Sequence, residues 1–136
     1  MSKGIQSPHH LGRWKLLKHS ILDTATGLEW QKDTTGPLSW QLAMDSAKAL
    51  RVGGHADWRL PIIEELETLL DRSLVGPAST FPAMPPEWFW SSSSYSGSSS
   101  PAWYVNFYNG YQSFVDKTGS GYVRCVRRGP SGGRKP

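Results

Sequence analysis

The chain has 136 residues, of which 38% are hydrophobic and seven are Trp, so it can bury the core of one domain but not of two. Its single cysteine, Cys125, excludes an intrachain disulfide and a thiolate metal site, and no apolar run is long enough for a membrane helix. The net charge is +4, but all eleven acidic residues lie between positions 23 and 117, with only six of the fifteen basic ones. Positive charge is therefore concentrated at the two ends.

The chain begins and ends in segments with the Pro, Gly and His content of loops. We expect flexible tails at residues 1–12 and 129–136 around a single domain at residues 13–128. Residues 1–22 lack the charged-then-apolar order of a signal peptide. Residues 23–27 predict a turn, followed by a half-buried strand at residues 28–31 in which Leu28 and Trp30 face the core.

Two helices are predicted next. Ser39 is the expected N-cap of the first, which has apolar residues at helical spacing and ends at the glycines of positions 53 and 54. Pro61 is expected to occupy the first position of the second helix, because its fixed φ suits that place. The buried stripe of this helix consists of Leu66, Leu69 and Leu70.

Strands dominate the last third. A Pro-rich, ordered loop is predicted after residue 71, and strands follow at residues 88–91, 103–107, 111–115 and 122–127. Asn109 and Gly110 indicate a type I′ hairpin turn. Alternation in the last strand places Cys125 in the core as a buried structural thiol. This order predicts an α+β domain with its helices on one side of the sheet.

Ser, Tyr and Asn are concentrated between residues 91 and 113. Tyr supplies contact area at low entropic cost, and Ser and Asn supply adaptable hydrogen bonds, so we expect a ligand-binding face. Alternation over residues 103–107 puts Tyr104 and Asn106 on the side opposite Trp103, Val105 and Phe107. A flexible linker at residues 91–100 is the alternative. The candidate ligand-binding residues here are Ser93, Tyr95, Ser98, Tyr104, Asn106, Tyr108, Asn109, Tyr111 and Ser113.

The basic ends supply a second candidate surface, which includes Arg124, Arg127 and Arg128. If the two ends meet, they form one positive patch that attracts polyanions such as sulfated glycans in a salt-sensitive way. Two solvated basic tails are the alternative. We expect no sequence-specific nucleic-acid partner.

Six motifs occur in a recognisable order. They are Asp23-Thr24-Ala25-Thr26-Gly27-Leu28-Glu29-Trp30-Gln31; Gly53-Gly54 with Asp57-Trp58-Arg59-Leu60-Pro61; Glu64-Glu65-Leu66; Phe89-Trp90-Ser91-Ser92; Ala102-Trp103-Tyr104-Val105; and Tyr122-Val123-Arg124-Cys125-Val126-Arg127. Together they resemble the Lcl C-terminal domain family, named for the trimeric head of a bacterial collagen-like adhesin, over roughly residues 21–128. Ile62 departs from the family, which more often has a small polar capping residue there.

The resemblance implies a C-type-lectin-like fold, similar to that of formylglycine-generating enzymes. In this fold two helices pack on a twisted antiparallel sheet, and the N- and C-terminal strands lie close together. The resemblance also implies recognition, on a bacterial or phage surface, of an anionic sulfated glycan or a cell-surface protein receptor. A homotrimer fits the family, but no heptad or collagen repeat enforces one here, so the oligomeric state stays open.

Relatives of this fold include the variable proteins of diversity-generating retroelements. In that alternative, residues 92–113 would form a face that is diversified for ligand binding.

We expect no catalytic activity, metal or cofactor. Formylglycine-type catalysis needs a cysteine pair, which Cys125 alone cannot supply. The carboxylate-bearing strings of calcium-dependent lectins are absent, and residues 91–102 contain no carboxylate. A Ser/His/Asp site could still assemble in space, although no Gly-x-Ser-x-Gly elbow is present. Arg59 is expected to be a structural residue that stacks on an aromatic ring or pairs with a carboxylate such as Asp57, with a ligand-binding cation as the alternative.

Overall fold

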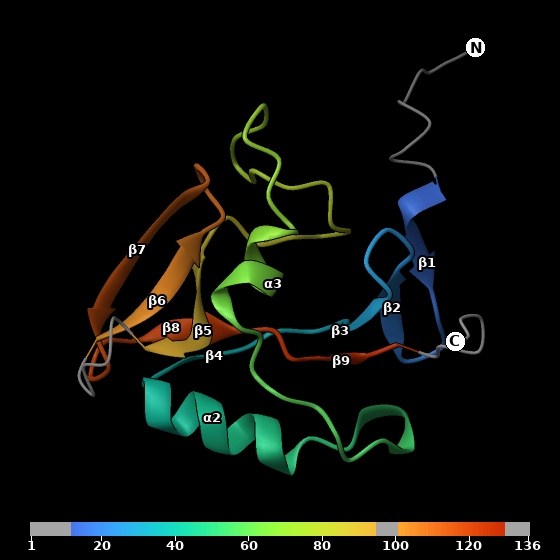
Figure 1. Cartoon of the computed structure of the whole chain (residues 1–136), viewed down its shortest axis with the longest axis horizontal. Coiled ribbons are helices and arrows are strands. Elements are labelled where there is room, and N and C mark those ends of the chain that lie inside the picture. The colour runs from blue at the N-terminus through green and yellow to red at the C-terminus, as the bar shows by residue number, and fades with distance from the viewer. Residues whose placement is uncertain (1–11, 95–100, 130–136) are drawn as a thin grey trace.

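The strands form two sheets. The computed structural model describes residues 12–94 and 101–129. The chain builds one sheet, then the other, and returns to the first for its last strand (Figure 1). The four-stranded sheet has the order β1 (Trp14–Leu16), β2 (Ser20–Asp23), β3 (Leu28–Gln31), β9 (Val126–Arg128). The five-stranded sheet has the order β4 (Thr35–Leu38), β8 (Gly121–Val123), β5 (Trp88–Ser94), β6 (Pro101–Asn106), β7 (Tyr111–Asp116).

Helices α2 and α3 cover opposite faces of the five-stranded sheet. Helix α2 (Trp40–Ala49) packs on β4, β5 and β8, whereas α3 (Ile63–Glu67) packs on β5 and β6. Strand β5 gives the reason, because Phe89 belongs to the apolar cluster with α3 and Trp90 to the cluster with α2. Successive strand residues point to opposite faces, so large apolar neighbours require cover on both. The α+β class is confirmed, but the expected single sheet with both helices on one side is wrong.

The first and last strands share the four-stranded sheet. Strand β9 pairs antiparallel with β3, and β1 lies at the opposite edge of the same sheet. The terminal strands are therefore in one sheet with β2 and β3 between them. All strand pairs are antiparallel except β5 with β8.

Helix α2 begins as predicted and ends earlier. Ser39 is its N-cap, and the hydroxyl of Ser39 accepts a hydrogen bond from the Leu42 N–H. The helix ends at Ala49, and the predicted glycine terminator lies beyond it in the short 3₁₀-helix η1 (Val52–Gly54). No helix among residues 12–94 and 101–129 is long and apolar enough to cross a membrane.

Helix α3 begins two residues later than predicted, at Ile63 with Ile62 as its N-cap. Ile62 has no polar side-chain atom, so other residues satisfy the first N–H groups of the helix. The Ser93 hydroxyl accepts from the Ile63 N–H at 2.9 Å, and the Glu65 carboxylate accepts from the Ile62 N–H at 3.0 Å. Strand β5 thus supplies from outside the capping group that position 62 lacks.

Arg59 has a structural partner. Its guanidinium forms a two-pronged ion pair with the Glu65 carboxylate, with both N–O distances 2.8 Å. The expected structural ion pair is present, but its carboxylate is Glu65 and not the suggested Asp57, which pairs with Arg127. The pair joins the segment before α3 to the first turn of that helix.

Two strand predictions need correction. The predicted last strand is divided into β8 and β9, and Arg124 and Cys125 between them are both buried. The β6–β7 connection is a four-residue loop, residues 107–110, closed by the pair Asn106 and Tyr111. Only Gly110 of this loop has a positive φ, so the turn is not type I′, which requires two such residues.

Three strands were not predicted, namely β1, β2 and β4. They have only three or four residues each, and none shows a clear alternation of buried and exposed positions. The Pro-rich segment is ordered as expected. Its backbone N–H groups at Gly76 and Ala78 donate to the carbonyls of Tyr108 and Phe107.

Candidate ligand-binding face

Four of the predicted ligand residues lie on one face of β6 and β7. Asn106 is paired with Tyr111, and Tyr104 with Ser113, so the four side chains project to the same side. We call these four residues the β6–β7 face. Helix α2 lies on this side of the sheet over β4, β5 and β8, which leaves the β6–β7 face largely uncovered. Strand β7 is the edge strand beside it (Figure 1).

Trp88 extends this face onto β5. It lies opposite Asn106, and its ring centroid is 4.8 Å from that of Tyr104 and 5.2 Å from that of Trp90. Gly121 makes room for the indole, because a Cβ at that position would lie 2.5 Å from Trp88 Cζ3. Trp88 was not among the predicted site residues, although its alternation with Trp90 was a signal that could have placed it beside Tyr104.

The face offers both aromatic surface and hydrogen-bonding groups. Tyr111 is 67% exposed, whereas Tyr104 and Ser113 are half-buried. The hydroxyls of these three residues have no hydrogen-bond partner within the described ranges. The side-chain oxygen of Asn106 accepts from the Tyr108 N–H, so the side-chain amide nitrogen of Asn106 is left to bind a ligand. This arrangement suits stacking and hydrogen bonding.

The hairpin tip carries two further predicted residues. Tyr108 is 54% exposed, and Asn109 is exposed with its side-chain oxygen accepting from the Tyr111 N–H. The tip lies against the Pro-rich loop, since Gly76 donates to the Tyr108 carbonyl and Gly110 is close to the Arg72 side chain. The predicted residues Tyr95 and Ser98 lie outside the described residues.

Ser93 does not belong with the β6–β7 face. Its hydroxyl is engaged at the start of α3, where it accepts from the Ile63 N–H. Its expected role as a surface hydrogen-bonding group conflicts with this contact. The signal in the sequence was Ile62 at the N-cap position of α3, because an Ile side chain cannot accept a hydrogen bond and another residue must do so.

Arg124 was expected on a basic surface and is buried instead, with only 2% of its surface exposed. Its Nη1 donates to the carbonyls of Gln31 and Lys32 at 2.8 and 2.7 Å, and its guanidinium lies 4.4 Å from the Phe81 ring centroid. Burial lowers the Arg124 pKa to about 10. An internal charge held in this way is unavailable to a polyanion, so the expectation for Arg124 was wrong.

Arg127 is neutralised by two carboxylates. It donates to Asp57 Oδ1 and to Glu29 Oε1, both at 2.6 Å, and Glu29 also accepts from the Ser20 hydroxyl. The hydrogen bond to Asp57 raises the Arg127 pKa, and the same bond lowers that of Asp57. Of the three predicted C-terminal arginines, only Arg128 is exposed.

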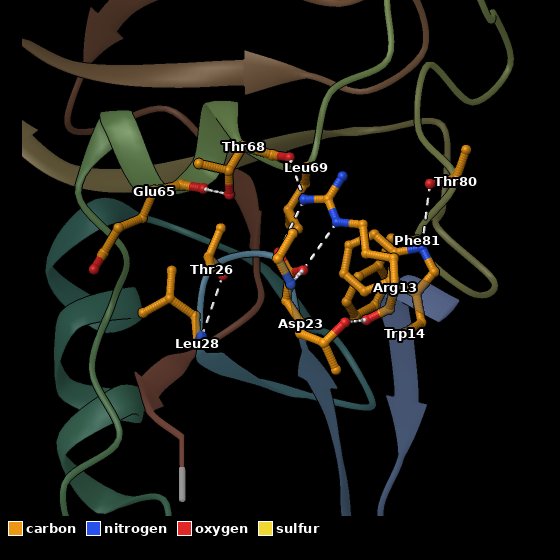
Figure 2. Close-up of polar contacts among 12 residues, drawn as sticks. Arg13, Trp14, Asp23, Thr26, Leu28, Glu65, Thr68, Leu69, Thr80 and Phe81 are labelled. Atoms are coloured by element: carbon orange, nitrogen blue, oxygen red, sulfur yellow. Dashed lines mark hydrogen bonds and ion pairs between the residues drawn. The ribbon is translucent and has the colours of Figure 1, made fainter. Parts of the chain in front are cut away.

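The N-terminal cations are also divided. Arg13 forms a two-pronged ion pair with the buried Asp23 and donates to the Thr68 carbonyl at 2.8 Å (Figure 2). The neighbouring Trp14 donates from Nε1 to the Thr80 hydroxyl. Lys15 and Lys18 are exposed. The two basic ends therefore do not merge into one patch of free cations within the described part of the chain.

Cys125 is buried, as predicted, and burial raises its pKa to about 12. Within residues 12–94 and 101–129, no three His, Cys, Asp or Glu side chains gather as metal ligands would.

A comparison with protein-family models matches residues 19–127 to the Lcl C-terminal domain. No curated protein matches the chain. The family match spans the four-stranded sheet from β2 onward, both helices and the β6–β7 face. Because the match covers most of the sequence, this chain belongs to the Lcl C-terminal domain family.

Proposed function

We propose that this chain is a non-catalytic ligand-recognition domain of C-type-lectin-like fold. Its β6–β7 face, with Trp88, binds an anionic glycan or a protein receptor. The observation that supports the proposal is the row Trp88, Asn106 and Tyr111 across three neighbouring strands. It combines an aromatic surface with free donors and acceptors. The aromatic rings of this row provide contact area for a ligand, and its polar groups can orient the ligand. Binding of this kind requires no covalent chemistry.

The distribution of charge favours this face over the basic ends as the main contact. Arg124 is buried and Arg127 is paired with two carboxylates, so Arg128 alone remains of the three C-terminal arginines. An anionic ligand would therefore gain long-range attraction from dispersed cations and its short-range contacts from Tyr104, Tyr111 and Ser113. Salt should weaken its binding only in part.

The test is binding of the purified protein to an array of sulfated and neutral glycans at low and physiological salt. Tyr111→Ala should weaken binding about 10-fold, as expected for an exposed aromatic anchor. Phe114→Ala is the matched control, because Phe114 is an exposed aromatic of the same strand on the opposite face. Equal losses in both variants would refute the assignment to the β6–β7 face. If no glycan binds the wild-type protein, the protein receptor becomes the remaining form of the proposal.

A second candidate is a variable protein of a diversity-generating retroelement. The supporting observation is the separation of buried and surface residues in β6, where Ala102 and Val105 are buried while Tyr104 and Asn106 reach the surface. A surface of this kind can change its polar residues while the core stays intact. The genomic test is a near-copy of the segment encoding residues 92–113 beside a reverse transcriptase gene, with differences confined to adenines of the copy. Absence of such a copy removes this candidate.

A further inference from the structure

The two sheets meet where the chain crosses between them. Gln31, at the end of β3, and Cys125, between β8 and β9, exchange hydrogen bonds there. The Gln31 N–H donates to the Cys125 carbonyl, and the Cys125 N–H donates to Gln31 Oε1, both at 2.9 Å. The guanidinium of Arg124 donates to the carbonyls of Gln31 and Lys32 at the same crossing. A side chain thus takes the place of a strand hydrogen bond at the junction.

A pocket of about 260 Å³ opens at this junction. Its size would hold a ligand of about the size of one sugar or a hydrated oxyanion. Its lining comes from the β1–β2 turn, the end of β3 and the start of η1, and consists of Lys18, His19, Gln31, Lys32, Asp33 and Val52. We call it the junction pocket.

Gln31 presents a hydrogen-bond donor to the junction pocket. Only 5% of its surface is exposed, and its oxygen is committed to the Cys125 N–H, which fixes the orientation of the amide. The amide nitrogen, with two N–H groups, has no hydrogen-bond partner in the described part of the chain. The buried side-chain atoms without a partner in the described residues are Trp30 Nε1 and Arg124 Nε, so the Gln31 amide nitrogen is reachable from the pocket, where it can donate to a ligand or water.

The charges around the amide favour an anion. Lys18 and Lys32 are exposed at the rim, and Lys32 Nζ is held over the β1–β2 turn by the carbonyls of Leu17 and Lys18 at 3.3 and 3.5 Å. The buried Arg124 guanidinium adds a positive charge behind the Lys32 carbonyl. Asp33 is the one carboxylate of the lining. Cations therefore outnumber anions at this site.

We propose that the junction pocket binds the oxyanion of a small acidic ligand, namely a carboxylate or a sulfate or phosphate group. The Gln31 amide donates to an oxygen of this group, Lys18 and Lys32 neutralise its charge, and Asp33 accepts from a neighbouring hydroxyl of the ligand. The inference goes beyond the proposed function, because none of these residues belongs to the β6–β7 face.

The experiment is a titration followed by the ¹H–¹⁵N NMR signals of the side-chain amide of Gln31 and the backbone amide of His19. The probes are sodium sulfate, sodium phosphate and sodium glucuronate at neutral pH, with glucose and sodium chloride as controls at matched ionic strength. A saturable shift with at least one oxyanion, absent with both controls, is the expected result. The three anions distinguish a carboxylate site from a sulfate or phosphate site.

Variants test the individual roles. Lys18→Gln and Lys32→Gln should each weaken binding about 2- to 5-fold, the usual scale for one exposed charge. Asp33→Asn should strengthen the binding of sulfate by a similar factor, since a like charge is removed and sulfate has no hydroxyl that could donate to Asp33. Arg128→Gln is the matched charge control and should leave binding unchanged, because Arg128 pairs with Leu28 at the far end of β3.

Gln31→Glu keeps an acceptor for the Cys125 N–H and replaces the donor by a carboxylate oxygen, so it should abolish binding. If this variant does not fold, the Lys18→Gln/Lys32→Gln double variant decides the question. The proposal would be overturned if the shifts do not saturate or if sodium chloride reproduces them. It would also be overturned if Arg128→Gln weakens binding as much as Lys32→Gln does. Tyr111→Ala should not alter these shifts, which separates failure here from failure of the β6–β7 face.

Discussion

Removing the Ser93 hydroxyl should destabilise the protein through α3, although Ser93 lies on β5. The hydroxyl accepts the hydrogen bond of the Ile63 N–H at 2.9 Å, thirty residues away in sequence. Ile62 cannot replace it, and the site is partly buried. In Ser93→Ala the first N–H of the helix therefore loses its acceptor.

The expected cost is that of a lost helix cap. Ser-to-Ala changes at caps cost about 1 kcal/mol, and a buried donor left unpaired costs about 1–3 kcal/mol. We expect a loss of about 1–2 kcal/mol in the free energy of unfolding, and a decrease of about 4–8 °C in Tm. Ile62→Ser in the Ser93→Ala background should recover about 1 kcal/mol, because Ser at the N-cap accepts from the next N–H groups of the helix.

Urea unfolding followed by Trp fluorescence and circular dichroism measures these changes. Ser92→Ala is the matched control, because the described residues give its hydroxyl no hydrogen-bond partner and only its backbone N–H is engaged, with Pro61. This control should stay within about 0.5 kcal/mol of wild type. If Ser93→Ala is no more destabilising than Ser92→Ala, the capping role is refuted.

Three further predictions concern the ion pairs of Arg127 and the thiol of Cys125. Arg127→Ala should lower the free energy of unfolding by about 2–4 kcal/mol, because Glu29 stays buried without its cation. Arg128→Ala should change it by about 0.5 kcal/mol or less. Equal effects of the two variants in urea unfolding would contradict a stabilising role of the ion pairs of Arg127 with Glu29 and Asp57. The Asp57 pKa is lowered in the folded protein, so the pairing of Asp57 with Arg127 stabilises the fold fully above the ordinary Asp pKa of 3.8. This stabilisation is lost as the pH falls through the folded-state pKa of Asp57. The stability difference between wild type and Asp57→Asn should accordingly be largest at neutral pH and shrink in acid, and a difference that grows in acid would reverse the assigned sign. Cys125 should resist a thiol reagent in the folded protein and react fully in urea, because its pKa is raised to about 12 and the side chain is buried; rapid labelling of the native state would argue against that burial.

Local sequence patterns predicted the elements whose determinants lie within a few residues. Ser39 capped α2 as expected, because an N-cap hydroxyl and the N–H group that donates to it lie within one turn. Trp30 is fully buried on β3, and Tyr104 and Asn106 share a face, because alternation along a strand fixes which side chains point together. Short strands such as β1 and β4 escaped prediction, since three or four residues carry too little periodicity.

The roles of several polar side chains depended on contacts that no local pattern encodes. Alternation could not show that the last strand breaks at Arg124, because the break follows from the return of the chain to the four-stranded sheet. It also could not show that Arg127 would meet Asp57 and Glu29, which are distant in sequence. A run of basic residues predicts exposed side chains until their partners are known, and this explains the wrong expectation of exposed cations at Arg124 and Arg127.

The sequence by itself determined the α+β class, the family, the buried thiol and the polar face of β6 and β7, because composition, periodicity and ordered motifs are properties of neighbouring residues. Tertiary structure alone decided that α2 and α3 cover opposite faces of one sheet, that Ser93 caps a remote helix, and that Gln31 lines the junction pocket while its side-chain oxygen accepts from Cys125. The physical reason is that hydrogen bonds and burial between distant segments depend on which strands become neighbours. Pairing between β3 and β9 joins residues about a hundred positions apart, beyond the reach of any local pattern.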